Sequence, residues 1–194
     1  SFMLYSRGLK STVVLLALGY TIDQAPRRIL SLWPTNSQAE KFSKAILCGD
    51  LLTPTPCLNF LGDSGKKRTA NKTILHKAFP GGLIDLFGAN APGDMRRAKG
   101  SWLYADEIDA IETQETDEGD QLTIFNKRGD EYPDTVRVFA SYPALKLLDA
   151  AGQPLTGHSR INTKLLRSDG NQWQSTCTVC GGEPFTMHTS HIVF

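Results

Sequence analysis

Two adjacent carboxylates, Asp106 and Glu107, directly follow the apolar run 102–105. At the end of a strand, one carboxylate of such a pair can hold Mg²⁺ through its water shell, and the other can orient or deprotonate an attacking water. A buried central strand that ends at a site has this pattern, which is that of a Walker B element. A plain strand followed by a solvated turn has it too, so the rest of the chain must decide between them.

A second candidate site lies in residues 6–12. A strand, a tight turn and a helix that begins at Lys10-Ser11 have the layout of a phosphate-binding loop. Backbone N–H groups and the positive helix end would cradle phosphates, Lys10 would neutralise them, and the Ser11 hydroxyl could ligate Mg²⁺. The full motif has Gly before the Lys, where this chain has Leu9, with Gly8 one position earlier. The alternative is a strand-to-helix turn with an incidental Lys-Ser.

A third candidate site is the pair Cys177 and Cys180, spaced Cys-x-x-Cys and followed by glycine as in a zinc knuckle. Structural zinc requires four ligands. His188 and His191 follow at a spacing that could complete the site, although zinc ribbons usually take a second Cys pair further along the chain. A zinc site and a metal-free tail are both compatible with the sequence.

Composition narrows the class of protein. A chain of 194 residues with 40% hydrophobic and 21% charged residues suits one globular domain with a sizeable core. The net charge of +1 provides no bulk attraction for nucleic acid. No apolar run approaches the roughly 20 residues of a membrane span. The four cysteines favour a reducing cytosol over a secreted disulfide scaffold. The start, residues 1–5, is too short for a signal peptide and is expected to be a strand entered abruptly, as in an excised piece.

The elements that would position these groups alternate as in a parallel α/β sheet. Strands are expected at 2–5, 28–33, 102–105 and 135–141, and helices at 11–19 and 38–47. Ser141 follows its strand as Asp106 follows its own, at the edge where open α/β sheets bind ligands. Ser141 could therefore sense a γ-phosphate, or it could end a plain strand.

The second helix and the residues after it carry further expectations. A cap at Thr35 or Ser37 would begin the helix. The residues expected on its buried face are Phe42, Ala45 and Ile46. Periodicity is lost over 48–71, which predicts a long surface loop whose basic cluster 66–68 is more typical of a solvated face than of a DNA contact.

Three further segments carry polar or charged residues. Residues 73–76 and 83–88 flank Pro-Gly-Gly and predict a hairpin, with His76 on a solvated or hydrogen-bonded face instead of acting as a base. The irregular loop 89–97 ends in two arginines that could reach a phosphate or DNA, with solvation as the default. The acidic run 112–120 is expected to be solvated.

Taken in this order, the pieces resemble the ATPase domain of the large terminase subunit of tailed phages, of the lambda-like GpA-type group. The resemblance covers nearly the whole chain. The motifs that carry it are SRGLKST (6–12), ALGY (17–20), WPT (33–35), AEKFSK (39–44), FPGG (79–82), GANAP (88–92), LYADEID (103–109), EGD (118–120), VFASYP (138–143), SRI (159–161) and CTVCG (177–181).

The resemblance implies a P-loop NTPase fold of the RecA/ASCE-like type, with a mostly parallel sheet flanked by helices. Residues 1–170 would form the ATPase core. Residues 171–194 would be a partial zinc-ribbon-like segment or the start of a linker to a nuclease domain, which is expected to be absent here. The implied function is that of a motor that hydrolyses ATP to package double-stranded DNA into procapsids.

The resemblance also assigns roles to residues. The nucleotide-binding loop would consist of Arg7, Gly8, Lys10, Ser11 and Thr12. Arg7 would stabilise the transferring phosphoryl group in cis, and Ser11 and Asp106 would hold Mg²⁺. Glu107 would activate water, and Ser141 would couple the nucleotide state to movement.

The implied cofactors are ATP and Mg²⁺, with zinc as a further candidate. The implied partners are double-stranded DNA, the small terminase subunit and the procapsid portal, engaged by a homo-oligomeric ring in the host cytoplasm. The alternative is a catalytically weak or inactive P-loop piece that serves DNA binding or assembly. Leu9 favours this alternative, whereas the Asp106-Glu107 pair favours the motor; a helicase-like remodeller is a third, weaker interpretation.

Overall fold

The computed structural model describes residues 10–56, 58, 73–111, 119–142, 159–166, 174–175 and 185–186. Its centre is a five-stranded sheet of order β2-β3-β1-β4-β5. The strands are β1 (Arg28–Trp33), β2 (His76–Phe79), β3 (Gly82–Gly88), β4 (Trp102–Ala105) and β5 (Val136–Phe139). β2 is antiparallel to β3, and the other neighbours are parallel. The predicted α/β class with a mostly parallel sheet is confirmed.

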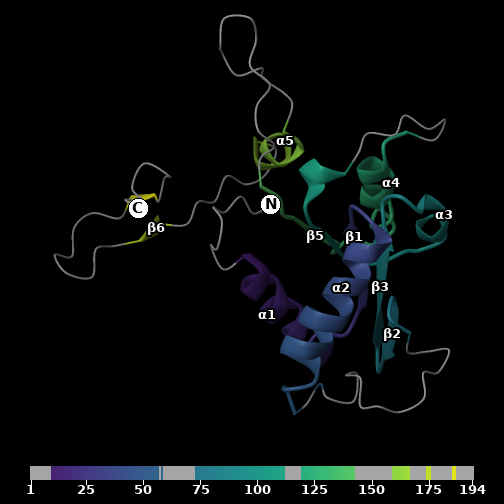
Figure 1. The fold of residues 1–194 in the computed structure, drawn as a ribbon, viewed down its shortest axis with the longest axis vertical. Helices are drawn as coiled ribbons and strands as arrows, with labels where there is room; N and C mark the ends of the chain where they lie inside the picture. Colours follow the sequence, from purple (N-terminus) through teal and green to yellow (C-terminus); the bar gives the residue numbers. More distant parts are fainter. Residues whose placement is uncertain are drawn as a thin grey trace, which may run out of the picture.

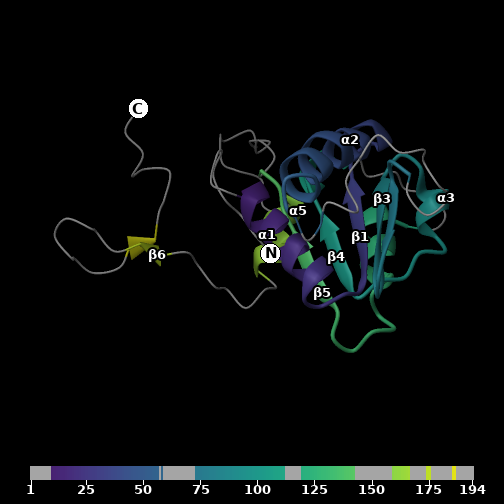
Figure 2. The ribbon, with the colours of Figure 1, turned by 90° about the horizontal axis from the view of Figure 1, so that it is seen from below.

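The central strands are buried on both faces. β1 pairs with β3 on one side and β4 on the other, so that Leu30 faces Asp85 and Leu103 across the ladders. Five of the six residues of β1 are buried, which is why the strand is an almost continuous apolar run instead of an alternating one. Figure 2 shows β4, β1 and β3 side by side.

Helices cover both faces. One layer consists of α1 (Lys10–Asp23), α2 (Asn36–Lys41) and η1 (Phe42–Leu52). The other consists of α3 (Pro92–Met95), α4 (Gln121–Lys127), α5 (Arg160–Leu166) and the short 3₁₀ turn η3 (Ile108–Ala110). Each layer buries its own core cluster against the sheet. Figure 1 shows α1 and α2 on one side of the strands and α3 and α4 on the other.

The direction of α1 follows from its connection to the sheet. The helix ends at Asp23, and β1 begins at Arg28. Val14, Leu18 and Ile22 lie at helical spacing and are buried in the cluster that also contains residues of β1 and β4. A helix joined to the next parallel strand by so short a connection runs antiparallel to it. The first turn of α1 therefore points toward the carboxyl edge of the sheet.

The second helix is longer and wider than expected. Thr35 is its cap, since the Thr35 Oγ1 accepts from the Gln38 N–H at 3.3 Å. From Phe42 onward the helix has π geometry, and the Thr53 N–H donates to the Cys48 carbonyl at 2.9 Å. The wider winding places the buried residues four to five positions apart, at Ala39, Phe42, Ser43, Leu47, Cys48 and Leu52. Ala45 is exposed, so the predicted buried face was wrong at this position.

The predicted surface loop 48–71 was also wrong at its start. Residues 48–52 are helical, and Cys48, Leu52 and Leu58 are buried in the core. The pattern seemed aperiodic because π winding does not repeat at the α-helical interval. Residue 57 and residues 59–72, which include the basic cluster 66–68, lie outside the described residues.

The hairpin is confirmed, with its first strand shifted to His76–Phe79. Gly81 has a φ of +81°, and a Cβ on Gly82 would lie 2.3 Å from the Arg27 carbonyl oxygen, so the Gly-Gly pair is required by this turn. The His76 Nδ1 contacts the Asp85 carboxylate, which confirms that His76 is on a hydrogen-bonded face. The predicted irregular loop 89–97 contains the single turn α3.

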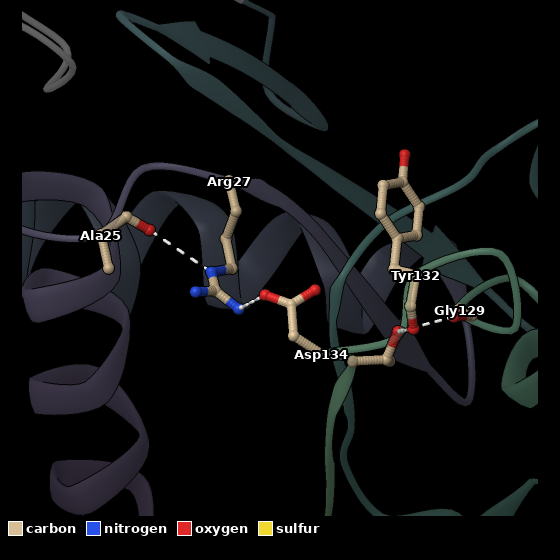
Figure 3. Close-up of polar contacts among 6 residues, drawn as sticks. Ala25, Arg27, Gly129, Tyr132 and Asp134 are labelled. Carbon is tan, nitrogen blue, oxygen red and sulfur yellow. Dashed lines mark hydrogen bonds and ion pairs between the residues drawn. The ribbon is translucent and has the colours of Figure 1, made fainter.

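The amino edge of the sheet is held by side-chain contacts between loops. Arg27, before β1, donates through Nη1 to the Asp134 carboxylate at 3.2 Å and through Nε to the Ala25 carbonyl at 3.4 Å (Figure 3). The loop before β5 is closed by the Thr135 Oγ1, which is 2.6 Å from the Gly129 carbonyl oxygen. Ion pairs Lys99–Glu131 and Arg137–Asp130 lie in the same region of the chain.

Candidate active site

Asp106 extends β4 by one residue at the carboxyl edge of the sheet. Its backbone N–H donates to the Leu32 carbonyl at 3.0 Å, so the residue still belongs to the ladder with β1. The side chain is buried, and its Oδ1 accepts from the Glu107 N–H at 2.9 Å. The Asp106 carboxylate is therefore held in a fixed position at the strand end.

Tyr104 lies below Asp106 on the same face of β4, since side chains alternate along a strand. Its ring packs with those of Trp33, Phe42 and Trp102 at centroid distances of 6.0, 6.5 and 6.3 Å. Burial, followed by the charge and the hydrogen bond of Asp106, raises the pKa of Tyr104 well above its ordinary value of 10.0. The phenol therefore stays protonated and supports the carboxylate from the apolar side.

Glu107 has an unusual backbone. Its φ of 49° and ψ of 43° are left-handed, and in the described part of the chain no other residue except Gly has a positive φ. This conformation costs a non-Gly residue about 1 kcal/mol or more and is concentrated at active sites. It turns the chain sharply from β4 into η3 and leaves Glu107 partly exposed beside the fixed Asp106.

Ser141 lies next to this turn, as the sequence predicted, because β5 pairs with β4. The Ala140 N–H donates to the Ala105 carbonyl at 2.9 Å, which continues the ladder to the strand ends. Ser141 is fully buried. Its hydroxyl accepts from the Asp109 N–H at 3.1 Å and donates to the Tyr142 carbonyl at 3.0 Å.

Asp109 is a residue whose position in the site the sequence analysis missed. Its Oδ2 accepts from the Ser159 hydroxyl at 2.7 Å, and its Oδ1 accepts from the Ile161 N–H at 3.0 Å. The only local signal was a third carboxylate shortly after the pair Asp106-Glu107. Its partners lie about 50 residues later in the chain, so no local pattern could reveal them.

Asp120 corrects the expectation that the whole run 112–120 is solvated. Its Oδ1 is 2.8 Å from the Arg160 Nη2, and its Oδ2 accepts from the Thr123 N–H as the cap of α4. The expectation failed because Arg160 comes to it from α5, far along the chain. Residues 112–118 lie outside the described residues.

The phosphate-loop residues are only partly described. Arg7 and Gly8 lie outside the described residues, and Lys10 is described only in its backbone, as the first residue of α1. Ser11 and Thr12 are exposed in the first turn of α1. That turn points toward the carboxyl edge, on the face of the sheet that Tyr104 and Asp106 share, and a helix N-terminus favours anions.

The donor set fits magnesium. A carboxylate fixed at a strand end and a hydroxyl in the first turn of a helix that points toward the same edge are oxygen ligands of the kind that Mg²⁺ prefers. In the part of the chain that the structure describes, no three His, Cys, Asp or Glu side chains gather into a group that could hold a metal ion. Cys177, Cys180, His188 and His191 lie outside that part.

Cys48 is a free, buried cysteine.

No described helix is long and apolar enough to span a membrane.

Comparison with known proteins gave one family and similar solved structures. The family model described as phage terminase large subunit gpA, ATPase domain, matches residues 1–192. The large terminase ATPase domain of Thermus phage P74-26 is similar at 15% identity and a TM-score of 0.47, covering 72% of this chain and 57% of that chain. An arginine-to-alanine mutant of that domain has a TM-score of 0.46, with the same identity and coverage. A search of curated protein sequences gave no match.

Proposed function

Because the chain belongs to the family of phage terminase large subunit gpA ATPase domains, we propose that it binds Mg²⁺·ATP at the carboxyl edge of its sheet and hydrolyses it. The observation that carries this proposal is the pair Asp106-Glu107 at the end of β4, with Asp106 buried and Glu107 held in a left-handed conformation. Two adjacent carboxylates in different environments can take different roles.

Glu107 is the proposed water-activating residue. It is partly exposed, whereas Asp106 is buried and hydrogen-bonded. A general base must reach solvent water, so Glu107 is the better placed of the two to orient a water molecule and accept its proton as the oxygen attacks the γ-phosphorus. The bond from the γ-phosphorus to the bridging oxygen then breaks, and ADP leaves with that oxygen.

Asp106 and Ser11 are the proposed magnesium ligands. Bound Mg²⁺ would supply positive charge that neutralises the phosphate oxygens. Asp106 suits this role because Tyr104 and the Glu107 N–H hold its carboxylate in place. Such outer contacts orient the residues that bind a metal.

The loop before α1 is the proposed phosphate-binding segment. In this proposal Lys10 and the backbone of Gly8 to Thr12 bind the phosphates, and Arg7 stabilises the transferring phosphoryl group. Its support is the direction of α1, which points its first helical turn toward the edge that carries Asp106. Leu9, in place of the usual Gly, is expected to weaken nucleotide affinity because its Cβ keeps the backbone away from the phosphates.

The test of the proposal is calorimetric titration of the chain with Mg²⁺·ATP, together with an assay of phosphate release. We expect binding that Lys10→Ala weakens at least about tenfold, because a direct charge-assisted phosphate contact is lost. Lys41→Ala is the matched control, since Lys41 is an exposed lysine on α2. Absence of binding in the unaltered chain would overturn the proposal.

One alternative has an observation in its favour. Leu9 could reduce the chain to a P-loop piece that binds nucleotide poorly or does not hydrolyse it, and that serves DNA binding or assembly. Binding without phosphate release, even in the presence of double-stranded DNA, would support this alternative over the ATPase.

We extend the proposal from ATP hydrolysis by this chain to the packaging of DNA by a larger terminase protein. The chain spans 57% of the length of the terminase ATPase structures that it matches. We propose that hydrolysis drives double-stranded DNA into a procapsid in the host cytoplasm, from a homo-oligomeric ring that engages the small terminase subunit and the portal. Stimulation of phosphate release by double-stranded DNA is the first check, and sedimentation with and without nucleotide tests for the ring.

The end of the chain stays a prediction. Residues 1–170 are proposed as the ATPase core, and residues 171–194 as a separate segment that binds zinc through Cys177 and Cys180. Metal analysis of the purified chain tests the zinc site, and Cys177→Ser should release the metal. A chain purified without chelators that contains no zinc would remove this proposal.

A further inference from the structure

Helix α5 is attached to the candidate active site by one carboxylate. Both oxygens of Asp109 are used: Oδ2 accepts from the Ser159 hydroxyl at 2.7 Å and Oδ1 from the Ile161 N–H at 3.0 Å. A charged acceptor at the start of a helix satisfies backbone donors that otherwise have no partner, and it interacts favourably with the helix dipole. Asp109 thus holds the first turn of α5 from outside the helix.

The backbone at Asp109 is held by the two residues that follow β5. Its N–H donates to the buried Ser141 hydroxyl at 3.1 Å, and the preceding Ile108 N–H donates to the Ala140 carbonyl at 3.4 Å. Asp109 is also only two residues beyond Glu107. A shift at Glu107 or Ser141 therefore moves Asp109 directly, with no flexible segment between them.

Two further contacts connect α5 to the same layer. The Arg160 Nη2 is 2.8 Å from the Asp120 carboxylate, which also caps α4. The Lys164 Nζ lies 4.5 Å from the centroid of the Phe139 ring in β5. α5 thus contacts η3, which follows β4, the last residue of β5, and the cap of α4.

We propose that Asp109 is a positioning residue through which a change at Glu107 and Ser141 reaches α5. The inference rests on the proposed function, because it supposes that nucleotide binds beside these residues. A hydrogen bond of about 3 Å is lost once its atoms separate by a further 0.6 Å or so. A small displacement of Asp109 therefore either moves α5 with it or releases the first turn of α5.

The inference also changes the expected role of Ser141. Its hydroxyl is buried and has two partners within the protein, the Asp109 N–H and the Tyr142 carbonyl. Ser141 then acts on movement through Asp109 and α5, and not by touching a phosphate.

The experiment measures hydrogen exchange of the α5 amides in the whole chain, without nucleotide and with the slowly hydrolysed analogue Mg²⁺·ATPγS, alongside calorimetry of Mg²⁺·ATP. In the unaltered chain we expect nucleotide to change α5 exchange at least about fivefold, the low end of measured coupling between sites. Asp109→Ala should abolish this nucleotide-dependent difference while the dissociation constant for Mg²⁺·ATP changes less than about twofold, because both carboxylate oxygens of Asp109 are directed to Ser159 and Ile161.

Control variants separate coupling from simple loss of structure. Asp134→Ala removes an exposed carboxylate from the opposite edge of the sheet and should leave the nucleotide-dependent difference intact. Ser159→Ala removes only one bond to Asp109 and should reduce the difference; it carries the test if Asp109→Ala does not fold. A merely structural cap would instead raise α5 exchange equally with and without nucleotide and leave their ratio unchanged.

Different failures point to different causes. If Mg²⁺·ATPγS binds but leaves α5 exchange unchanged in the unaltered chain, the role of Asp109 is overturned and the nucleotide site stands. If Asp109→Ala or Ser159→Ala folds and keeps the full difference, the role is likewise overturned. If no nucleotide binds, both the proposed function and this inference fall.

Discussion

The two edges of the five-stranded sheet are held together in different ways. At the amino edge, ion pairs join loops, and their carboxylates are mostly exposed: the Asp134 and Glu131 side chains are 66% and 63% accessible. At the carboxyl edge, Asp106 and Ser141 are buried, and each accepts a hydrogen bond from a backbone N–H of the neighbouring turn, Glu107 for Asp106 and Asp109 for Ser141.

This difference follows from what each edge must do. Exposed ion pairs are screened by water and salt and leave their long side chains free to move, which is sufficient to close a loop. A buried carboxylate with fixed partners holds its oxygens in one place, which is what binding a cation or activating a water requires. Among the described residues, Glu107 at the carboxyl edge is the only one other than glycine with a left-handed backbone. The free energy that this conformation costs is offset by the contacts around it.

The largest expected effect is on turnover at the carboxyl edge. Glu107→Gln keeps the size of the side chain but removes the base, so phosphate release should fall about 10²- to 10⁴-fold. Mg²⁺·ATP affinity should be nearly unchanged by calorimetry. Glu131→Gln, at the amino edge, is the matched control and should keep full activity. If Glu107→Gln retained activity, another residue would have to be the base.

The next effect concerns the support below Asp106. Tyr104→Phe removes a buried donor to a carboxylate and should lower the free energy of unfolding by about 1–3 kcal/mol in urea denaturation. It should also raise the Mg²⁺ concentration needed for half-maximal turnover, because Asp106 loses its orientation and binds the cation less tightly. Unchanged stability and magnesium dependence would show that the aromatic packing alone positions Asp106.

The same tyrosine makes the free energy of unfolding depend on pH. Its pKa is raised in the folded chain, so the unfolded state releases this proton first as the pH rises above 10.0. Stability from this group is therefore complete below that pH and is lost above it. The fall in stability above pH 10.0 should be steeper in the unaltered chain than in Tyr104→Phe. Parallel curves for the two proteins would contradict the burial of the phenol.

A smaller effect, of opposite sign, is expected from relieving the strain. Glu107→Gly should raise the free energy of unfolding by about 1 kcal/mol, because Gly adopts the left-handed conformation without steric cost, although turnover is lost. Glu107→Ala also removes the carboxylate but keeps the strain, so it is the control. Equal stability of the Gly and Ala variants in thermal unfolding would argue against a strained backbone.

The smallest effect is expected at the amino edge. Asp134→Ala breaks the exposed contact with Arg27 shown in Figure 3 and should cost at most about 1 kcal/mol, less in high salt. Urea denaturation at low and high salt measures it. A loss larger than that of Tyr104→Phe would reverse the comparison between the two edges.

Much of the sheet could be predicted because its signals are local. The apolar runs of β1 and β4 and the Pro-Gly-Gly turn depend on residues next to one another in the chain, and the observed strands agree with them. The second helix was predicted less well. Its π winding from Phe42 to Leu52 changes the spacing of buried residues, and an α-helical pattern search does not detect that spacing.

The sequence by itself determined the α/β class and the place of the acidic pair Asp106-Glu107 at a strand end, because both depend on short-range pattern. Only the tertiary structure decided the left-handed turn at Glu107, the phenol below Asp106 and the capping of α5 by Asp109. These features depend on groups from separate strands and helices, some about 50 residues apart, which meet only when the sheet and its helices have packed.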